Sequence, residues 1–109
     1  MVTYKDMDDA YYGRGRFEGD GRATILADMA ADARNRSRHY ELLAKEERRA
    51  HNDSDAALWV DASYRHYADY RTMCTAVSVC VDPKHYSDCD DNVMRFVDWL
   101  AYKKNSEED

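Results

Sequence analysis

Proline and glycine are scarce in this sequence, with one proline and four glycines among 109 residues. Folds built from many short strands need more turn residues than this, and disordered chains are usually rich in one or both, so neither class fits. No stretch approaches the roughly 18 consecutive apolar residues of a membrane-spanning helix. The acidic opening, MVTYKDMDD, has no signal-peptide pattern. We therefore expect residues 1–109 to form a single helical domain without a membrane segment.

Cysteine is also rare. The three cysteines are an odd number without a disulfide framework, which favours a reduced protein in the cytoplasm. A zinc ion would need about four converging ligands. Cys74 and Cys80 are six residues apart on one expected helix and would point about 120° apart. Cys80, His85 and Cys89 match no strong zinc spacing. The sequence therefore predicts core cysteines, no metal and no cofactor.

Recognisable catalytic motifs are missing as well. The chain has no nucleophile elbow and no His-Glu-x-x-His motif. The stretch GRGRFEGDGR, residues 13–22, has the glycines of a phosphate loop. However, Glu18 stands where a dinucleotide fingerprint has its third glycine, and no Lys-Ser/Thr pair follows. We expect a protein that binds rather than an enzyme.

What the sequence does contain is helical periodicity, in three segments at residues 23–50, 54–81 and 83–104. Pro83 ends the second segment, and the third begins either there or at Ser87. Residues 1–22 form an N-terminal arm with a short apolar helical pattern ended by Gly13, and residues 105–109 form an acidic tail. These features predict an all-α fold: a three-helix antiparallel bundle, with a short fourth helix at the N-terminus if the arm folds.

Apolar residues recurring at three- and four-residue steps predict the buried face of each helix. The first helix should bury Leu26, Met29, Ala33, Ser37, Tyr40, Leu43 and Glu47. The second should bury Ala56, Val60, Tyr64, Tyr67, Cys74, Val77 and Val81, and Trp59, His66, Tyr70, Met73 and Cys80 widen its arc. The third should bury Tyr86, Cys89, Val93, Phe96, Val97 and Leu100. The wide arc makes the second helix the central one.

Aromatic residues on the second and third helices are more numerous than a small core requires. Tyrosine and tryptophan are frequent at protein interfaces because they combine a large apolar body with a polar tip. An acidic group lies near the start of the third helical segment. The sequence thus predicts a partner-binding surface that comprises Tyr64, Tyr67, Tyr70, Trp99, Tyr102, Asp88, Asp90 and Asp91.

The predicted function is therefore that of a small non-enzymatic interaction protein that binds another protein and modulates or inhibits it. Small acidic helical proteins are common among phage and mobile-element products that inhibit a host nuclease, polymerase or defence complex, which would place the chain in the host cytoplasm. That association depends on how often such proteins occur, not on particular residues. A homo-oligomer formed through the wide apolar arc of the second helix is equally consistent with the pattern.

The alternative is a nucleic-acid-binding protein with an arginine-rich arm and a basic stripe on the first helix. The chain's net charge of −6 disfavours nucleic-acid binding, and Glu41 interrupts the basic stripe. The residues that would contact phosphates or bases are Arg14, Arg16, Arg22, Arg34, Arg38 and Arg49.

Overall fold

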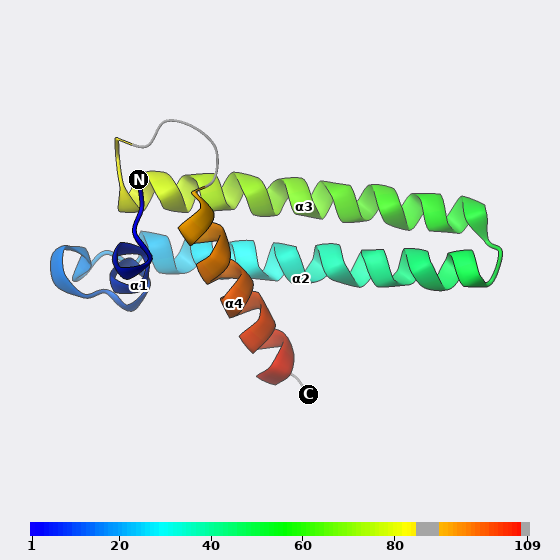
Figure 1. The fold of residues 1–109 in the computed structure, drawn as a ribbon, viewed down its shortest axis with the longest axis horizontal. Helices are drawn as coiled ribbons and strands as arrows, with labels where there is room; N and C mark the ends of the chain where they lie inside the picture. Colours follow the sequence, from blue (N-terminus) through cyan, green and yellow to red (C-terminus); the bar gives the residue numbers. More distant parts are fainter. Residues whose placement is uncertain (85–89, 108–109) are drawn as a thin grey trace.

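The computed structural model describes residues 1–84 and 90–107, and these ranges contain helices and no strand (Figure 1). The predicted all-α class is therefore confirmed, and the N-terminal arm does contain a fourth helix. The elements are α1 (Tyr4–Tyr12), the 3-10 turn η1 (Gly15–Phe17), α2 (Arg22–Arg49), α3 (Asp53–Val81) and α4 (Asp91–Glu107).

Helices α2 and α3 form an antiparallel hairpin that runs the length of the molecule (Figure 1). The chain reverses within three residues because α2 ends in a tight hydrogen-bonded turn. His51 adopts a left-handed conformation with φ of 63°, and its amide donates to the Arg48 carbonyl at 3.1 Å. The Asn52 amide donates to the Glu47 carbonyl at 2.8 Å. This pair of bonds satisfies carbonyls that the helix end would otherwise leave open.

Small side chains line the contact between α2 and α3. On α3 the buried residues Ala56, Ser63, Tyr70 and Val77 recur every seven residues, as in an antiparallel coiled coil. Small residues let two helix axes approach closely, which suits a hairpin that has little bulk to bury. On α2 the buried residues are mostly alanines, namely Ala23, Ala27, Ala30, Ala31, Ala33, Ser37 and Ala44.

The predicted face of α2 was therefore partly wrong. Ala33 and Ser37 are buried as expected, but Met29 is exposed and Tyr40 and Leu43 are only half-buried. Alanine adds little to a hydrophobic pattern, so the larger side chains on the flank of α2 dominated the prediction. On α3, Tyr64 is likewise exposed rather than buried.

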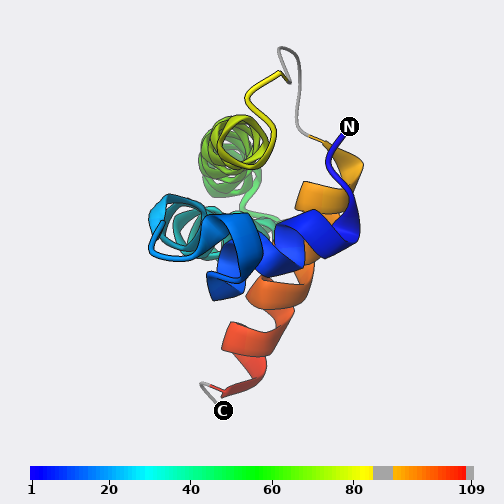
Figure 2. The same cartoon turned by 90° about the vertical axis from the view of Figure 1, so that its left-hand side faces the viewer.

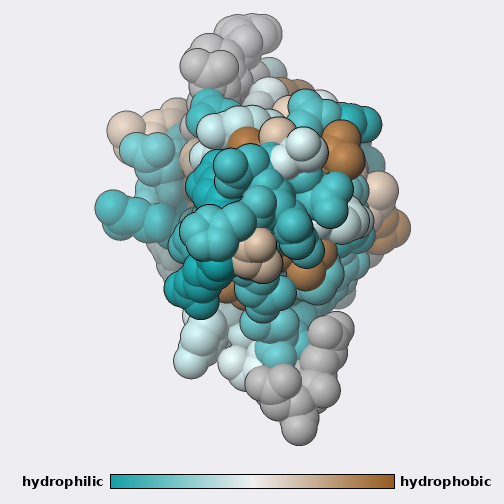
Figure 3. Space-filling view, turned by 90° about the vertical axis from the view of Figure 1, so that its right-hand side faces the viewer, coloured by the Kyte–Doolittle hydropathy of each residue, from teal (hydrophilic) through white to brown (hydrophobic). Residues whose placement is uncertain are grey.

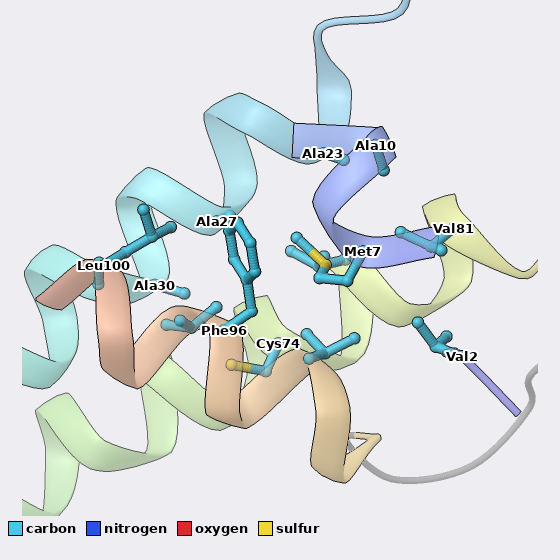
Figure 4. Packing of buried hydrophobic residues seen from close by; sticks show 14 of the residues in the cluster. Val2, Met7, Ala10, Ala23, Ala27, Ala30, Cys74, Val81, Phe96 and Leu100 are labelled. Carbon is cyan, nitrogen blue, oxygen red and sulfur yellow. The ribbon is translucent and has the colours of Figure 1, made fainter. Parts of the chain in front are cut away.

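Helices α1 and α4 lie on one side of the hairpin and cover only its end farthest from the α2–α3 turn (Figures 1 and 2). Helix α4 crosses α2 obliquely, whereas the predicted bundle had all three long helices antiparallel. The core forms where α1 and α4 meet the hairpin, with Met7, Phe96 and Leu100 packed against the alanines of α2 (Figure 4). Val93, Phe96, Val97 and Leu100 are buried as predicted.

Helix α4 begins at Asp91, later than Pro83, the predicted start that lies among the described residues. Pro83 and Lys84 form a turn, so the helix does not start at Pro83. Ser87, Tyr86 and Cys89 lie outside the described residues. At its other end, α4 continues to Glu107 and so includes the first part of the predicted acidic tail.

Asp90 joins three parts of the chain. Its carboxylate accepts hydrogen bonds from the Asn92 amide at 2.9 Å and from the Val2 amide at 3.1 Å. Its own amide donates to the Ser78 hydroxyl at 3.2 Å. The Asn92 side chain donates to the Val2 carbonyl at 2.9 Å. Asp90 therefore caps α4 and, together with Asn92, holds the N-terminal segment against the ends of α3 and α4.

Replacing Asp90 with alanine should lower the free energy of unfolding by about 2 kcal/mol, since it removes a helix cap and a hydrogen bond to partly buried backbone. Asp90→Asn should lose less because the amide oxygen can still cap the helix. Asp91→Ala, which truncates the exposed neighbour, serves as the matched control. Urea unfolding monitored by circular dichroism measures all three, and equal losses for Asp90→Ala and Asp91→Ala would contradict this role.

Candidate functional site

An aromatic cluster connects α1 and α4, with the buried ring of Phe96 at its centre. The Phe96 centroid lies 5.7 Å from that of Tyr4, 5.2 Å from Tyr11 and 5.5 Å from Trp99. The Tyr12 ring meets Tyr11 edge-on at 5.1 Å. We call these five residues the aromatic cluster. Tilted and edge-on ring pairs at such distances are favourable, so these contacts help to hold α1 against α4.

The outer members of the aromatic cluster remain accessible. Trp99 is 40% exposed, and Tyr4 and Tyr12 are exposed to a similar degree. Two cations lie over these rings: the guanidinium of Arg14 is 4.9 Å from the Tyr12 centroid, and the Lys103 ammonium is 5.3 Å from that of Trp99. Arg14 also pairs with Asp8 at 3.0 Å. The result is a half-buried aromatic surface with positive charge at its rim.

Tyr11 is tied to the hairpin as well as to α4. Its hydroxyl donates to Asp28 at 2.7 Å, and the Thr24 hydroxyl donates to the Tyr11 carbonyl at 2.6 Å. Burial, together with the bond to Asp28, raises the pKa of Tyr11 well above its ordinary value. The phenol therefore keeps its proton and acts as a donor that fixes α1 against α2.

Of the predicted aromatic residues, Tyr64 and Tyr102 are the most accessible, both 69% exposed, and Tyr67 is half-buried. Tyr102 and Trp99 both belong to α4, whereas Tyr64 lies on the part of α3 that α4 does not cover. There it lines a groove of about 190 Å³ with Glu41, Ala44, Lys45, Arg48, Val60 and Ser63. The structure therefore separates the predicted aromatic surface into two regions.

Tyr70 belongs to the core, with only 1% of its surface exposed, so it is not available to a partner. Its hydroxyl donates to Asp98 at 2.9 Å. Burial, the nearby Cys74 thiol and the bond to Asp98 raise the pKa of Tyr70 far above its ordinary value. The sequence pattern assigned Tyr64, Tyr67 and Tyr70 both to the wide apolar arc and to the partner surface, because three-residue steps drift around a helix and do not identify the buried member.

These two tyrosines predict how stability depends on pH. Above about pH 10 the unfolded phenols lose their protons while the folded ones keep them, so stability that is present below pH 10 is lost as the pH rises. The Tyr11→Phe/Tyr70→Phe double variant should therefore lose stability less steeply above pH 10 than the wild type. Urea unfolding at a series of pH values measures the slopes, and identical slopes would refute this origin.

The predicted acidic residues also differ in their surroundings. Asp91 is exposed at the start of α4, whereas the Asp90 carboxylate is occupied by the junction described above. Asp88 lies outside the described residues. Of the three predicted acidic residues, Asp91 is therefore the one that the described surface presents as an exposed carboxylate.

Four of the six predicted nucleic-acid contacts have partners within the chain. Arg14 pairs with Asp8, and Arg16 donates to the Val81 carbonyl at 2.9 Å, which satisfies the end of α3. Arg22 pairs with Asp20 at 2.8 Å, and hydrogen bonds from Arg22 lower the pKa of Asp20 to about 2. Arg34 lies over the Tyr67 and Tyr70 rings and 3.8 Å from Asp98.

Within residues 1–84 and 90–107, Arg38 and Arg49 are the two arginines of that set whose side chains form no ion pair, hydrogen bond or ring contact. Arg38 is half-buried and Arg49 is exposed, and Glu41 lies between them in sequence. A nucleic-acid ridge needs several adjacent free cations to neutralise phosphates. The basic stripe expected on the first helix is therefore interrupted by the internal roles of its arginines, Arg34 above all.

Two of the cysteines, Cys74 and Cys80, lie among the described residues. Cys74 is buried in the core and Cys80 is half-buried. Within residues 1–84 and 90–107, no group of three His, Cys, Asp or Glu side chains is arranged to hold a metal ion. His85 and Cys89 lie outside the described residues.

Four members of the aromatic cluster were not predicted as site residues: Tyr4, Tyr11 and Tyr12, and Phe96, which was predicted only as a core residue. Tyr4 and Tyr11 are seven residues apart, a spacing that places them on one face of a helix. Combining that spacing with the off-stripe position of Trp99 could have indicated an aromatic contact between the two helices. What the sequence could not supply is that α1 packs beside α4.

No family model matches the chain, and comparisons with curated proteins and with solved structures give no match. Among the described residues, no helix is both long enough and apolar enough to cross a membrane.

Proposed function

We propose that this chain is a non-enzymatic helical protein that binds another protein through the exposed rings of the aromatic cluster, and modulates or inhibits it. If the chain is a phage or mobile-element inhibitor, as the sequence predicts, its partner is a host nuclease, polymerase or defence complex. The carrying observation is that Trp99, Tyr4 and Tyr12 remain accessible although they contact rings anchored in the core.

This arrangement suits binding because little conformational entropy is lost when a partner covers rings that are already fixed. Residues that dominate binding energy are enriched in tryptophan, tyrosine and arginine. The aromatic cluster supplies tryptophan and tyrosine, and the arginine is Arg14, which Asp8 and Asp9 hold over the Tyr12 ring. A binding surface of this composition suits a partner protein that has an apolar patch. Acidic residues around that patch would meet Lys103.

The internal partners of Arg14, Arg16, Arg22 and Arg34 weaken the nucleic-acid alternative. Releasing Arg16 to contact a phosphate would leave the Val81 carbonyl without its hydrogen bond. Releasing Arg34 would remove a partly buried cation from Asp98 and two rings. Each phosphate contact would thus have to compensate for an interaction lost within the fold.

The proposal is tested by capture from lysate of the source cell, with the immobilised wild type compared with a Tyr4→Ala/Trp99→Ala variant. A specific protein should be retained by the wild type and lost by the double variant, with circular dichroism confirming that the variant is folded. Tyr64→Ala is the matched control, because it removes an exposed ring from a different region. Retention by the double variant, or loss by Tyr64→Ala instead, would refute the proposed surface.

The alternative predicts a different outcome. A nucleic-acid binder should shift a labelled oligonucleotide at low ionic strength, and the shift should weaken steeply as salt rises. A salt-sensitive shift that Arg38→Ala/Arg49→Ala abolishes would replace the protein-binding proposal.

A further inference from the structure

One side of the α2–α3 hairpin is covered by no described element. Helices α1 and α4 pack against the opposite side (Figure 2). We call the uncovered side the back face. On α2 it presents Ile25, Met29, Arg36, Tyr40 and Leu43, which lie within an arc of about 60°. The arc is centred away from Asn35, whose side chain donates to the Ala101 carbonyl of α4, and Arg36 also borders a surface hollow of about 360 Å³ that Asn35 and Asn105 of α4 line.

The α3 half of the back face repeats every seven residues. Trp59, His66, Met73 and Cys80 form this row, and all four are half-buried. This row lies next to the buried row of Ala56, Ser63, Tyr70 and Val77, which faces α2. Helix α3 therefore carries more apolar positions than its contact with α2 uses. A wider apolar arc is typical of a helix that packs against more than one neighbour.

Interlocked rings make the back face rigid near the turn. The Tyr40 ring is parallel within 12° to both Trp59 and His66, with centroid distances of 5.5 Å and 5.2 Å. Trp59 and His66 are seven residues apart, a rise of about 10.5 Å, so Tyr40 is inserted between them. This insertion also fixes the register of the two helices. The face nevertheless stays open, and Ile25 at the other end is 62% exposed.

Two opposite charges occupy the middle of the back face. In the register set by Tyr40, Arg36 lies within about one helical turn of the level of Asp69 on α3. Both side chains are exposed, and neither forms an ion pair within residues 1–84 and 90–107. The face is thus balanced in charge, although the whole chain carries a net charge of −6. Because of this net negative charge, two copies of the chain that met through other parts of their surfaces would tend to repel each other.

We propose that two copies of this chain associate back face to back face, so that α2 and α3 of each copy form a four-helix bundle. A two-fold axis parallel to the hairpin places α2 of one copy opposite α3 of the other at the same level. Arg36 then meets Asp69 of the second copy, and the contact occurs twice. The arrangement also covers Ile25, Met29 and Met73. It is independent of the proposed function because the aromatic cluster lies on the other side of the hairpin.

The end of the hairpin at the α2–α3 turn argues for side-by-side rather than end-to-end association. Seen from that end, the surface is mostly hydrophilic, and its hydrophobic residues are in separate patches (Figure 3). Hydrophilic ends suit a bundle whose two turns lie side by side in solvent.

Analytical ultracentrifugation over a range of protein concentrations tests the proposal. The wild type should sediment as a monomer–dimer equilibrium, and Arg36→Asp and Asp69→Arg should each raise the dissociation constant about tenfold or more, because like charges then meet twice. Arg95→Asp, on α4, makes the same change in net charge as Arg36→Asp. It should leave the dissociation constant unchanged. A wild type that stays monomeric at every concentration would overturn the proposal.

Mixing the two single variants gives the decisive measurement. Arg36→Asp in one copy faces Asp69→Arg in the other, and the native Asp69 faces the native Arg36, so the mixture should form a heterodimer with near wild-type affinity. Repulsion within one chain could not be relieved in this way. Variants that dimerise as well as the wild type, or a mixture as weak as either variant alone, would show that the back face is not the interface.

Discussion

Replacing Phe96 with alanine should lower the free energy of unfolding by about 3–5 kcal/mol, the range for truncating a buried aromatic ring. Phe96 is the ring that Tyr4, Tyr11 and Trp99 all contact, so its loss leaves a cavity where α1, α4 and the hairpin meet (Figure 4). A domain of this size has a total stability of about 5–15 kcal/mol. The variant should therefore be marginally stable, with α1 the first element to detach.

Two further variants make this result interpretable. Phe96→Leu keeps most of the volume and should cost about 1–2 kcal/mol, which gives a measurable value if the alanine variant does not fold. Tyr102→Ala truncates an exposed ring on the same helix and should change stability by less than about 0.5 kcal/mol. Urea unfolding measures all of them. A Phe96→Ala variant no less stable than Tyr102→Ala would mean that the cluster does not hold the helices together.

Enlarging Ala30 to leucine should cost about 3 kcal/mol or more, at the upper end of the range for overpacking. Ala30 is fully buried on α2, near Phe96 and Leu100 of α4 (Figure 4). Its neighbours Ala27, Ala31 and Ala33 are also fully buried. Alanine side chains leave little room between the helix backbones. The three carbon atoms that leucine adds can therefore be accommodated only if α2 moves away from its partners.

Ala57→Leu is the matched control for Ala30→Leu. It makes the same substitution at an exposed position of α3 and should change stability by no more than about 0.5 kcal/mol. The difference between the two variants therefore isolates the cost of steric overlap from helix propensity. Thermal unfolding in parallel would show it, and similar melting temperatures for the two would refute a close-packed alanine interface.

The sequence predicted the elements better than their arrangement. Helical periodicity, Pro83 and Gly13 were sufficient to locate four helices, because each signal is local. The oblique crossing of α4 depends on how bulky Phe96 and Leu100 pack against alanines of α2, which no single segment encodes. Of the two predicted starts of α4, Pro83 was wrong because the chain turns there, and Ser87 lies outside the described residues; the cap that the structure shows is Asp90.

The candidate site was only partly predictable for the same reason. Trp99 and Tyr102 were separable from the core because they lie off the buried stripe of α4. Tyr70 was not separable from Tyr64 and Tyr67, since burial there depends on Asp98 approaching from α4. The arginines that seemed free in sequence are paired with residues or carbonyls that the fold brings to them, as Arg16 is with Val81.

The hydrogen bonds that join Val2 to Asp90 and Asn92 span 88 and 90 residues of chain. Contacts near the α2–α3 turn, in contrast, link residues that are close in sequence, so far less chain entropy is lost when they form. We therefore expect the hairpin to assemble first and the two ends of the chain to meet last. In pulsed hydrogen exchange during refolding, amides around the turn should gain protection before that of Val2, and the reverse order would exclude this sequence of events.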